Sequence, residues 1–139
     1  MDKVMKLLKK NKYMTLATSA RNRPRSSIVE YIMVGDTMVI MTDPTTIKAK
    51  NLAKNNKVSL SVSKIPKDIM KAVYMTIDGV AEPATKAEKD GYNKVLFERY
   101  PAFAGMNEFL KVALYFRVKF KTAYYSVGMG KAEKIKYKD

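Results

Sequence analysis

A segment rich in hydroxyl and lysine side chains has the composition of a phosphate-binding site. It reads Thr42-Asp43-Pro44-Thr45-Thr46-Ile47-Lys48-Ala49-Lys50-Asn51-Leu52 and follows an apolar run, residues 38–41. We predict that this run is a buried strand and that a short helix begins at the paired threonines. The start of a helix attracts anions, and hydroxyls and ammonium groups suit a phosphate monoester. The alternative is a capped surface helix whose lysines are solvated.

The chain lacks the side chains that most often carry catalysis. It contains no cysteine and no histidine. This composition excludes disulfides, thiol nucleophiles, Cys/His metal sites and Ser-His or Cys-His arrangements, so we predict no metal site. Acid–base chemistry would fall to carboxylates, lysines or tyrosines, and no catalytic side chain can be named. If the protein is an enzyme, we expect a bound cofactor to carry the chemistry.

Length and charge limit the class of protein. The chain has 139 residues, 47% of them hydrophobic, and we expect one domain over residues 1–139 with a core of ordinary size. Its net charge of +14 attracts polyanions, but the lysines are spread along the whole chain, which argues against a specific nucleic-acid partner. No apolar run approaches the roughly 18 residues of a membrane span. The amino terminus lacks the apolar core of a signal peptide, so we expect a cytoplasmic protein without a membrane partner.

The elements that must position the candidate site read mainly as short strands. Helices are predicted at residues 2–12, 46–55 and 85–99, with one helical turn at 108–111. Strands are predicted at 13–18, 25–34, 37–41, 58–62, 72–82, 114–120, 123–127 and 134–137, with loops at 20–24 and 102–107. Pro24 should end the ladder, and Gly79 should mark a bulge or a close backbone approach. Thr85 and Glu88 form a capping box. The pattern predicts a mainly β (α+β) fold, an antiparallel sheet closed into a barrel with a few flanking helices.

With this order of elements, the chain resembles the pyridoxamine 5′-phosphate oxidase-like family of FMN-binding split β-barrels. The resemblance begins at Tyr13–Thr18, continues through Arg23–Ser27, and is most specific at Thr42–Leu52. Residues 58–60 also match, and the family's order of elements extends over about the first 82 residues. The second half matches only in general outline. The resemblance implies an antiparallel split β-barrel.

The resemblance also implies a cofactor site at the interface of a homodimer. In the family, the strand that matches Arg25–Ile28 runs beside the FMN ring, with its arginine toward the phosphate. The positions of Thr42, Thr46 and Lys48 hold the phosphate, while Ile47 stands where many members carry arginine. Tyr74 and Tyr124 are candidates for ring contacts from the second subunit, with core packing as the alternative. The predicted cofactor-binding residues are Arg25, Ser26, Ser27, Ile28, Thr42, Thr46, Ile47 and Lys48.

The function implied is that of a homodimeric flavoprotein, an oxidoreductase acting on an undetermined small substrate. The family's true oxidase binds its substrate through a carboxyl-terminal Arg-x-His, which this chain lacks, so that activity is not expected. Haem-handling relatives ligate iron through histidine and are disfavoured for the same reason. Three alternatives remain: a deazaflavin-dependent reductase, a non-enzymatic flavin-binding or storage protein, and, below both, a nucleic-acid-binding module.

Overall fold

The fold is mainly β in the computed structural model, which describes residues 2–138. The α-helices are α1 (Asp2–Lys10), α2 (Ile47–Lys54), α3 (Lys86–Arg99) and α4 (Asn107–Val112), and the 3-10 helices are η1 (Ile69–Lys71) and η2 (Pro101–Gly105). The strands are β1 (Tyr13–Ala20), β2 (Arg23–Val34), β3 (Thr37–Thr42), β4 (Lys57–Lys64), β5 (Val73–Pro83), β6 (Leu114–Val127) and β7 (Glu133–Lys136). The mainly β class predicted from the sequence is confirmed.

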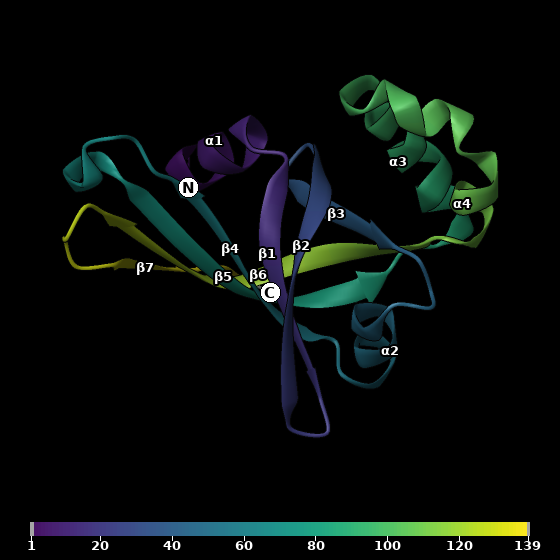
Figure 1. Ribbon diagram of the computed structural model, residues 1–139, viewed down its shortest axis with the longest axis horizontal. Coiled ribbons are helices and arrows are strands. Elements are labelled where there is room, and N and C mark those ends of the chain that lie inside the picture. Colours follow the sequence, from purple (N-terminus) through teal and green to yellow (C-terminus); the bar gives the residue numbers. More distant parts are fainter. Residues whose placement is uncertain (1, 139) are drawn as a thin grey trace.

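The strands form one antiparallel sheet that closes on itself. Its order is β3-β2-β1-β4-β5-β6-β7, and a further pairing joins β3 to β6, with Met38 opposite Val118 and Thr42 opposite Leu114. Strands β1 to β6 therefore form a closed barrel, and β7 extends it beside the second half of β6 (Figure 1). This arrangement confirms the predicted antiparallel split barrel.

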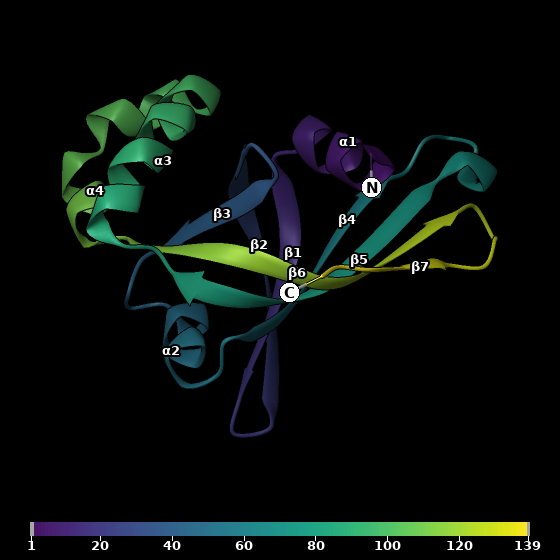
Figure 2. The ribbon, with the colours of Figure 1, turned by 180° about the vertical axis from the view of Figure 1, so that it is seen from behind.

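The helices lie at different places around the barrel. The segment that contains α3, η2 and α4 joins β5 to β6, which are neighbours in the sheet. We call this helical segment, residues 84–113, the excursion. Figures 1 and 2 both place α3 and α4 together at one end of the molecule and β7 at the other. None of the helices within residues 2–138 is long and apolar enough to cross a membrane.

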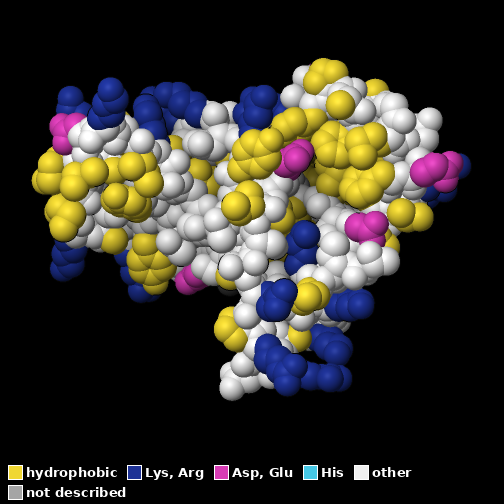
Figure 3. Space-filling view, in the orientation of Figure 1, with side chains coloured by type: hydrophobic (Ala, Val, Ile, Leu, Met, Phe, Trp, Pro, Cys, Tyr) yellow, Lys and Arg dark blue, Asp and Glu magenta, His cyan; other side chains and the backbone are white. Residues whose placement is uncertain are grey.

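Basic side chains are concentrated in space although they are dispersed in the sequence. The hairpin of β1 and β2 projects from the barrel beside α2, and it carries exposed Arg21, Arg23 and Arg25. Arg21 and Asn22 form its tight turn with positive φ angles of 51° and 62°. Figure 3 shows Lys and Arg side chains gathered over this projecting part. Positive charge is therefore gathered beside the segment predicted to bind phosphate.

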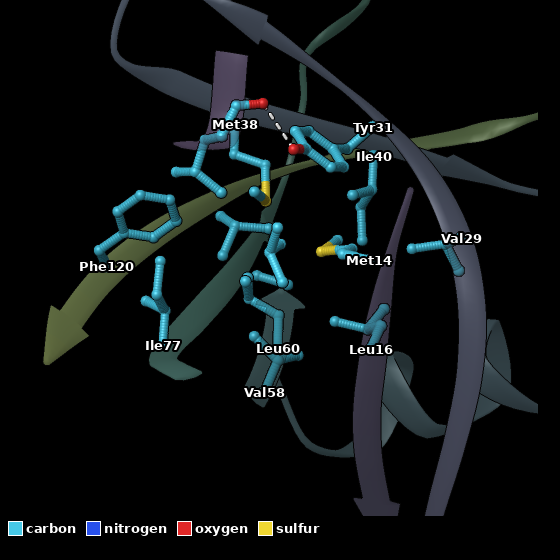
Figure 4. Packing of buried hydrophobic residues seen from close by; sticks show 14 of the residues in the cluster. Met14, Leu16, Val29, Tyr31, Met38, Ile40, Val58, Leu60, Ile77 and Phe120 are labelled. Atoms are coloured by element: carbon cyan, nitrogen blue, oxygen red, sulfur yellow. Dashed lines mark hydrogen bonds between the residues drawn. The ribbon is translucent and has the colours of Figure 1, made fainter. Parts of the chain in front are cut away.

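The core fills the barrel and anchors α1 against it. Leu8, Leu16 and Ile77 are among the side chains with no exposed surface, and Figure 4 shows how core residues from several strands converge. The buried Tyr31 hydroxyl donates a hydrogen bond to the Leu8 carbonyl at 2.5 Å, which ties α1 to β2. Burial of the phenol, and secondly the nearby Tyr100, raise the pKa of Tyr31 well above its ordinary value.

One strand was predicted as two. Residues 114–127 form the single strand β6, not separate strands at 114–120 and 123–127. Asp78 pairs with Thr122 and Gly79 pairs with Phe120, so the pairing skips one residue of β6 at a bulge. The bulge reverses the inward and outward alternation, and this reversal resembles a strand end in the sequence. The predicted irregularity at Gly79 is confirmed, because an added Cβ would lie 2.5 Å from the Lys119 carbonyl oxygen.

Two shorter predictions were also wrong. Pro24 does not end the ladder but lies inside β2, opposite Ser19. The β2–β3 pairing begins only at Tyr31, so β2 has no second strand at Pro24, and a missing N–H is tolerated there. The predicted loop at 102–107 is instead η2 followed by the start of α4. The capping box is confirmed, because the Thr85 hydroxyl accepts from the Glu88 N–H while a Glu88 carboxylate oxygen accepts from the Thr85 N–H.

Candidate functional site

Two adjoining grooves lie where β2, the β3–α2 turn and the helical excursion meet. The polar groove has a volume of about 360 Å³ and is lined by Arg25, Ser26, Ser27, Thr45, Thr46, Ile47 and Lys48. The apolar groove has a volume of about 280 Å³ and is lined by Ile28, Val29, Glu30, Met41, Thr42, Asp43, Thr46, Lys48, Phe103 and Phe109. The two grooves share Thr46 and Lys48. All eight predicted cofactor-binding residues line one groove or both.

The threonine hydroxyls of the turn mostly bond to one another and to the backbone. The Thr42 and Thr46 Oγ1 atoms are 2.8 Å apart, and the Thr46 hydroxyl donates to the Asp43 carbonyl at 2.9 Å. The Thr45 hydroxyl donates to the Asp43 carboxylate at 2.6 Å. Thr42 is also buried. These hydroxyls fix the shape of the turn. The sequence suggested them as groups that suit a phosphate, but their own hydrogen bonds lie within the turn.

The start of α2 presents backbone donors to the polar groove. Thr46 is the N-cap, as predicted, and its hydroxyl oxygen accepts from the Ala49 N–H at 3.2 Å. The Thr46 carbonyl accepts from the Lys50 N–H at 3.1 Å. Within residues 2–138, these bonds leave the N–H groups of Ile47 and Lys48 without an internal acceptor, as expected in a first helical turn. Two N–H groups without an internal acceptor and the positive end of the helix dipole therefore lie at a helix start whose residues, Ile47 and Lys48, line the groove.

The Asp43 carboxylate stays ionised beside this cluster. Its hydrogen bonds from the Thr45 hydroxyl and then the Thr45 N–H hold the pKa of Asp43 below its ordinary value, and Lys48 lowers it further. The carboxylate accepts both Thr45 bonds inside the turn. The carboxylate therefore closes the turn. The cations that line the polar groove are Lys48 and Arg25.

The free edge of β2 forms the opposite side of the site. From Arg23 to Glu30 this strand is paired with β1, and the pairing with β3 begins only at Tyr31. Over that stretch, the second edge of β2 has no strand partner within residues 2–138. A free strand edge offers alternating backbone N–H and C=O groups, which can bond a heterocycle with donors and acceptors along one side.

Side-chain amides on α2 fix the helix against the hairpin. The Asn51 amide donates to the Thr18 hydroxyl at 3.1 Å, and the Asn55 amide donates to the Ser19 carbonyl at 3.0 Å. Thr18 is buried and lies opposite Arg25 in the β1–β2 ladder. The two asparagines therefore set the position of the helix start relative to Arg25.

Sequence reasoning missed the residues that the excursion and the strand ends bring to the apolar groove. Phe103 and Phe109 come from η2 and α4, while Glu30 and Met41 come from β2 and β3. No local signal could reveal the phenylalanines, because their position depends on how the excursion folds back over the barrel. The sequence offered a weak signal for Glu30. It lies in β2 two residues beyond Ile28, the last of the residues predicted to lie beside the ring, and alternate residues of a strand share a face.

Three residues considered from the sequence lie elsewhere. Lys50 is exposed and lines neither groove. Tyr74 is 42% exposed on β5, and Tyr124 is half-buried on β6. Neither tyrosine lines the polar or the apolar groove, so their predicted contacts with a partner's cofactor stay predictions.

Another cavity does not resemble a phosphate site. It has a volume of about 340 Å³, lies where α1 approaches the carboxyl-terminal tail, and is lined by Met5, Phe120 and Tyr137 together with both acidic and basic side chains. Among residues 2–138, no group of acidic side chains is close enough to hold a metal ion.

Comparison with known proteins identifies the family. A family model described as pyridoxamine 5′-phosphate oxidase matches residues 1–125. The chain belongs to the pyridoxamine 5′-phosphate oxidase family. The family resemblance inferred from the turn and its neighbouring strands is thereby confirmed. A comparison with curated protein sequences gave no match.

Several solved structures have the fold of this oxidase-family chain at low sequence identity. A FAD-binding protein from Mesorhizobium loti is 15% identical, with a TM-score of 0.71, and the match covers 88% of this chain and 89% of that one. A FAD and heme binding protein from Mycobacterium smegmatis is 15% identical, with a TM-score of 0.74 and coverages of 95% and 73%. A heme binding protein from the same organism is 18% identical, with a TM-score of 0.80 and a coverage of 94% of this chain but only 55% of that one. At these identities the likeness shows the fold alone.

Proposed function

We propose that this oxidase-family chain binds FMN and acts as a flavin-dependent oxidoreductase on a small substrate. The observation that carries the proposal is the junction of a cationic groove with an apolar groove at Thr46 and Lys48. FMN has the matching division between a phosphate and a flat ring. Flavin-binding proteins among the solved structures of the same fold agree with the proposal.

The polar groove suits the phosphate. Arg25 and Lys48 supply two cations, and the N–H groups of Ile47 and Lys48 supply uncharged donors at a helix start. Charge-assisted hydrogen bonds of this kind are stronger than neutral ones. Thr42 and Thr46 act by holding the turn that positions these donors. Ile47 contributes its backbone N–H rather than a charge, so this chain has one cation fewer than the family's Ser-Arg-Lys pattern.

The apolar groove suits the ring. Ile28, Val29 and Met41 offer apolar contact, and the free edge of β2 from Ser26 to Ile28 offers backbone donors and acceptors. When bound, the flavin supplies hydride or electron transfer, which this chain's own side chains cannot perform. The residues themselves hold the ring, exclude water from one of its faces and neutralise the phosphate. The absence of histidine disfavours haem as the resident group.

The proposal includes a homodimer with the cofactor at its interface. Ile28 is 76% exposed and Ile47 is 49% exposed, although both line the grooves. Large apolar side chains so open beside a ligand groove are typical of a surface that another chain covers. A second copy of this chain would shield the ring from water, and Tyr74 is a candidate for its contact.

The test is an FMN titration that compares two lysines of the same helix. Lys48→Ala removes a charge-assisted bond of about 1.5–3 kcal/mol, so the Kd for FMN should rise about ten- to a hundred-fold. Lys54→Ala is the matched control, because it changes the net charge equally at the far end of α2. Similar titration curves for the wild type and Lys48→Ala would refute the phosphate assignment. A similar rise in the Kd for FMN in both variants would show that the effect comes from the net positive charge of the protein and not from a bond made by Lys48.

The dimer has its own test. Light scattering at micromolar concentration should give twice the chain mass for the FMN-loaded protein, and Ile28→Lys should lower that mass by placing a charge in the interface. A monomer mass with FMN still bound would contradict the proposed interface, while the phosphate assignment would stand.

A further inference from the structure

The geometry points to a second subsite in the apolar groove, with Phe103 and Phe109 as its wall, that takes a flat aromatic compound without negative charge. This inference rests on the proposed function, because FMN would occupy the side of the groove along β2. The second compound would lie against the phenylalanines and face the ring. The inference specifies the class of substrate, which the family and its fold leave open.

The wall is a cluster of aromatic rings. Phe103 lies between two others, with ring centroids 6.1 Å from Phe109 and 6.0 Å from Tyr100. The Tyr100–Phe103 pair is edge-to-face, at 78°. Phe103 and Phe109 are only partly buried and line the groove, so they present apolar aromatic surface to any compound inside it. Aromatic surfaces favour stacked or edge-on contact with another flat ring.

The wall is fixed relative to the strand that would carry the flavin. The Tyr100 hydroxyl donates to the Tyr31 carbonyl of β2 at 3.2 Å or to the Lys12 carbonyl at 3.1 Å. The Arg99 guanidinium donates to the Asn11 carbonyl at 3.2 Å. The excursion is therefore bonded to the barrel beside the groove, which holds its phenylalanines in place next to β2. A flat compound placed between the phenylalanines and a bound flavin ring would contact both.

The charges around the groove exclude an anion from this side. The charged residues that line it are Glu30, Asp43 and Lys48. Lys48 lies at the junction with the polar groove, where the FMN phosphate would neutralise it. The excursion contributes Phe103 and Phe109 and no cation to the lining. A compound with a phosphate or sulfonate would therefore lose its hydration without gaining a partner, which is costly.

The experiment is a calorimetric titration of FMN-loaded protein with 2-naphthol and with naphthalene-2-sulfonate. Both probes are flat and have the same ring system, but only the second is an anion. The net charge of +14 would by itself favour the sulfonate. We expect 2-naphthol to bind more tightly despite this field. Tighter binding of the sulfonate would overturn the inference.

Substitutions of Phe103 and Phe109 test whether 2-naphthol binds against these two rings. Phe103→Leu and Phe109→Leu keep apolar bulk but remove the flat surface, and each should raise the Kd of 2-naphthol about tenfold. The Kd for FMN, which is placed along β2, should change much less than the Kd of 2-naphthol, and the thermal unfolding midpoint should fall by a few degrees at most, because both rings also pack in the aromatic cluster. Ile65→Ala is the control, since Ile65 is an exposed apolar residue in the β4–β5 connection, at the opposite end from α3 and α4 (Figure 1). Unchanged naphthol binding in both leucine variants would refute the subsite.

The experiments distinguish failure of the proposed FMN site from failure of the second subsite. If the wild type does not bind FMN, the proposed function is wrong. If it binds FMN but 2-naphthol does not bind, or binds equally well to the leucine variants, the second subsite is wrong and the flavin site stands.

Discussion

Replacing Thr46 by valine should disturb the candidate site through the shape of its turn rather than through a lost ligand contact. Valine has nearly the same shape but no hydroxyl. The Thr46 hydroxyl caps α2 by accepting from Ala49, donates to the Asp43 carbonyl and lies 2.8 Å from the Thr42 hydroxyl. Its single hydrogen is therefore engaged within the turn.

The magnitude follows from those bonds. Loss of an N-cap side chain costs about 0.5–2 kcal/mol. Loss of the bond to the Asp43 carbonyl adds about 0.5–1 kcal/mol, because the Thr46 N–H still donates to that oxygen at 3.2 Å. Thr46→Val should therefore lower the free energy of unfolding by about 1–3 kcal/mol. If FMN binding must re-order the loosened turn, its Kd should rise up to about tenfold, since 1.4 kcal/mol corresponds to a factor of ten.

The assay combines urea unfolding with FMN titration for the wild type, Thr46→Val and Thr46→Ser. Serine keeps the hydroxyl and should recover most of both losses. Unchanged stability in Thr46→Val would show that the hydroxyl network does not hold the turn. A Kd increase far above tenfold with unchanged stability would instead mean that the hydroxyl contacts the phosphate directly, which contradicts the internal bonding described here.

Three further predictions concern the barrel and its charge. Tyr31→Phe removes one donor from the Leu8 carbonyl, which keeps only the longer bond from the Asn11 N–H at 3.4 Å, and should cost about 0.5–1.5 kcal/mol of unfolding free energy. Because burial raises the pKa of Tyr31 above its ordinary 10.0, the wild type should lose stability as pH rises above about 10, and the variant should lack that part of the loss. Gly79→Ala should destabilise the protein by about 1–3 kcal/mol in urea unfolding, since the new Cβ meets the Lys119 carbonyl, whereas Gly91→Ala in α3, with open space around it, should be neutral or stabilising. Binding to DNA or RNA should fall steeply with salt in a filter or anisotropy assay and show no sequence preference, and a preference that persists at high salt would contradict this.

The helix start at Thr46 could be predicted because its signals are local. A buried strand, a proline turn and paired threonines follow one another within a few residues, and the structure has the N-cap where the sequence places it. The hydroxyl bonds inside that turn could not be predicted, since a threonine can cap, bond a neighbour or face a ligand with the same sequence around it. The sequence of the turn shows which hydroxyl donors are present, but not which groups they bond to.

The errors came from features that depend on distant segments. The strand β6 looked divided because a bulge at Asp78–Gly79 reverses the alternation that defines a strand in sequence. Pro24 looked like a strand end because the free edge that tolerates it is set by where β3 begins to pair. Phe103 and Phe109 belong to the candidate site only because the excursion between β5 and β6 returns to β2. Each depends on tertiary pairing rather than on local propensity.

The most direct test of the central claim is the absorbance spectrum of the freshly purified protein, followed by mass identification of the released chromophore. The account predicts an oxidised flavin spectrum, the mass of FMN, and about one FMN per chain after loading. A deazaflavin or haem chromophore, or a colourless protein that takes up no FMN at micromolar concentrations, would contradict it.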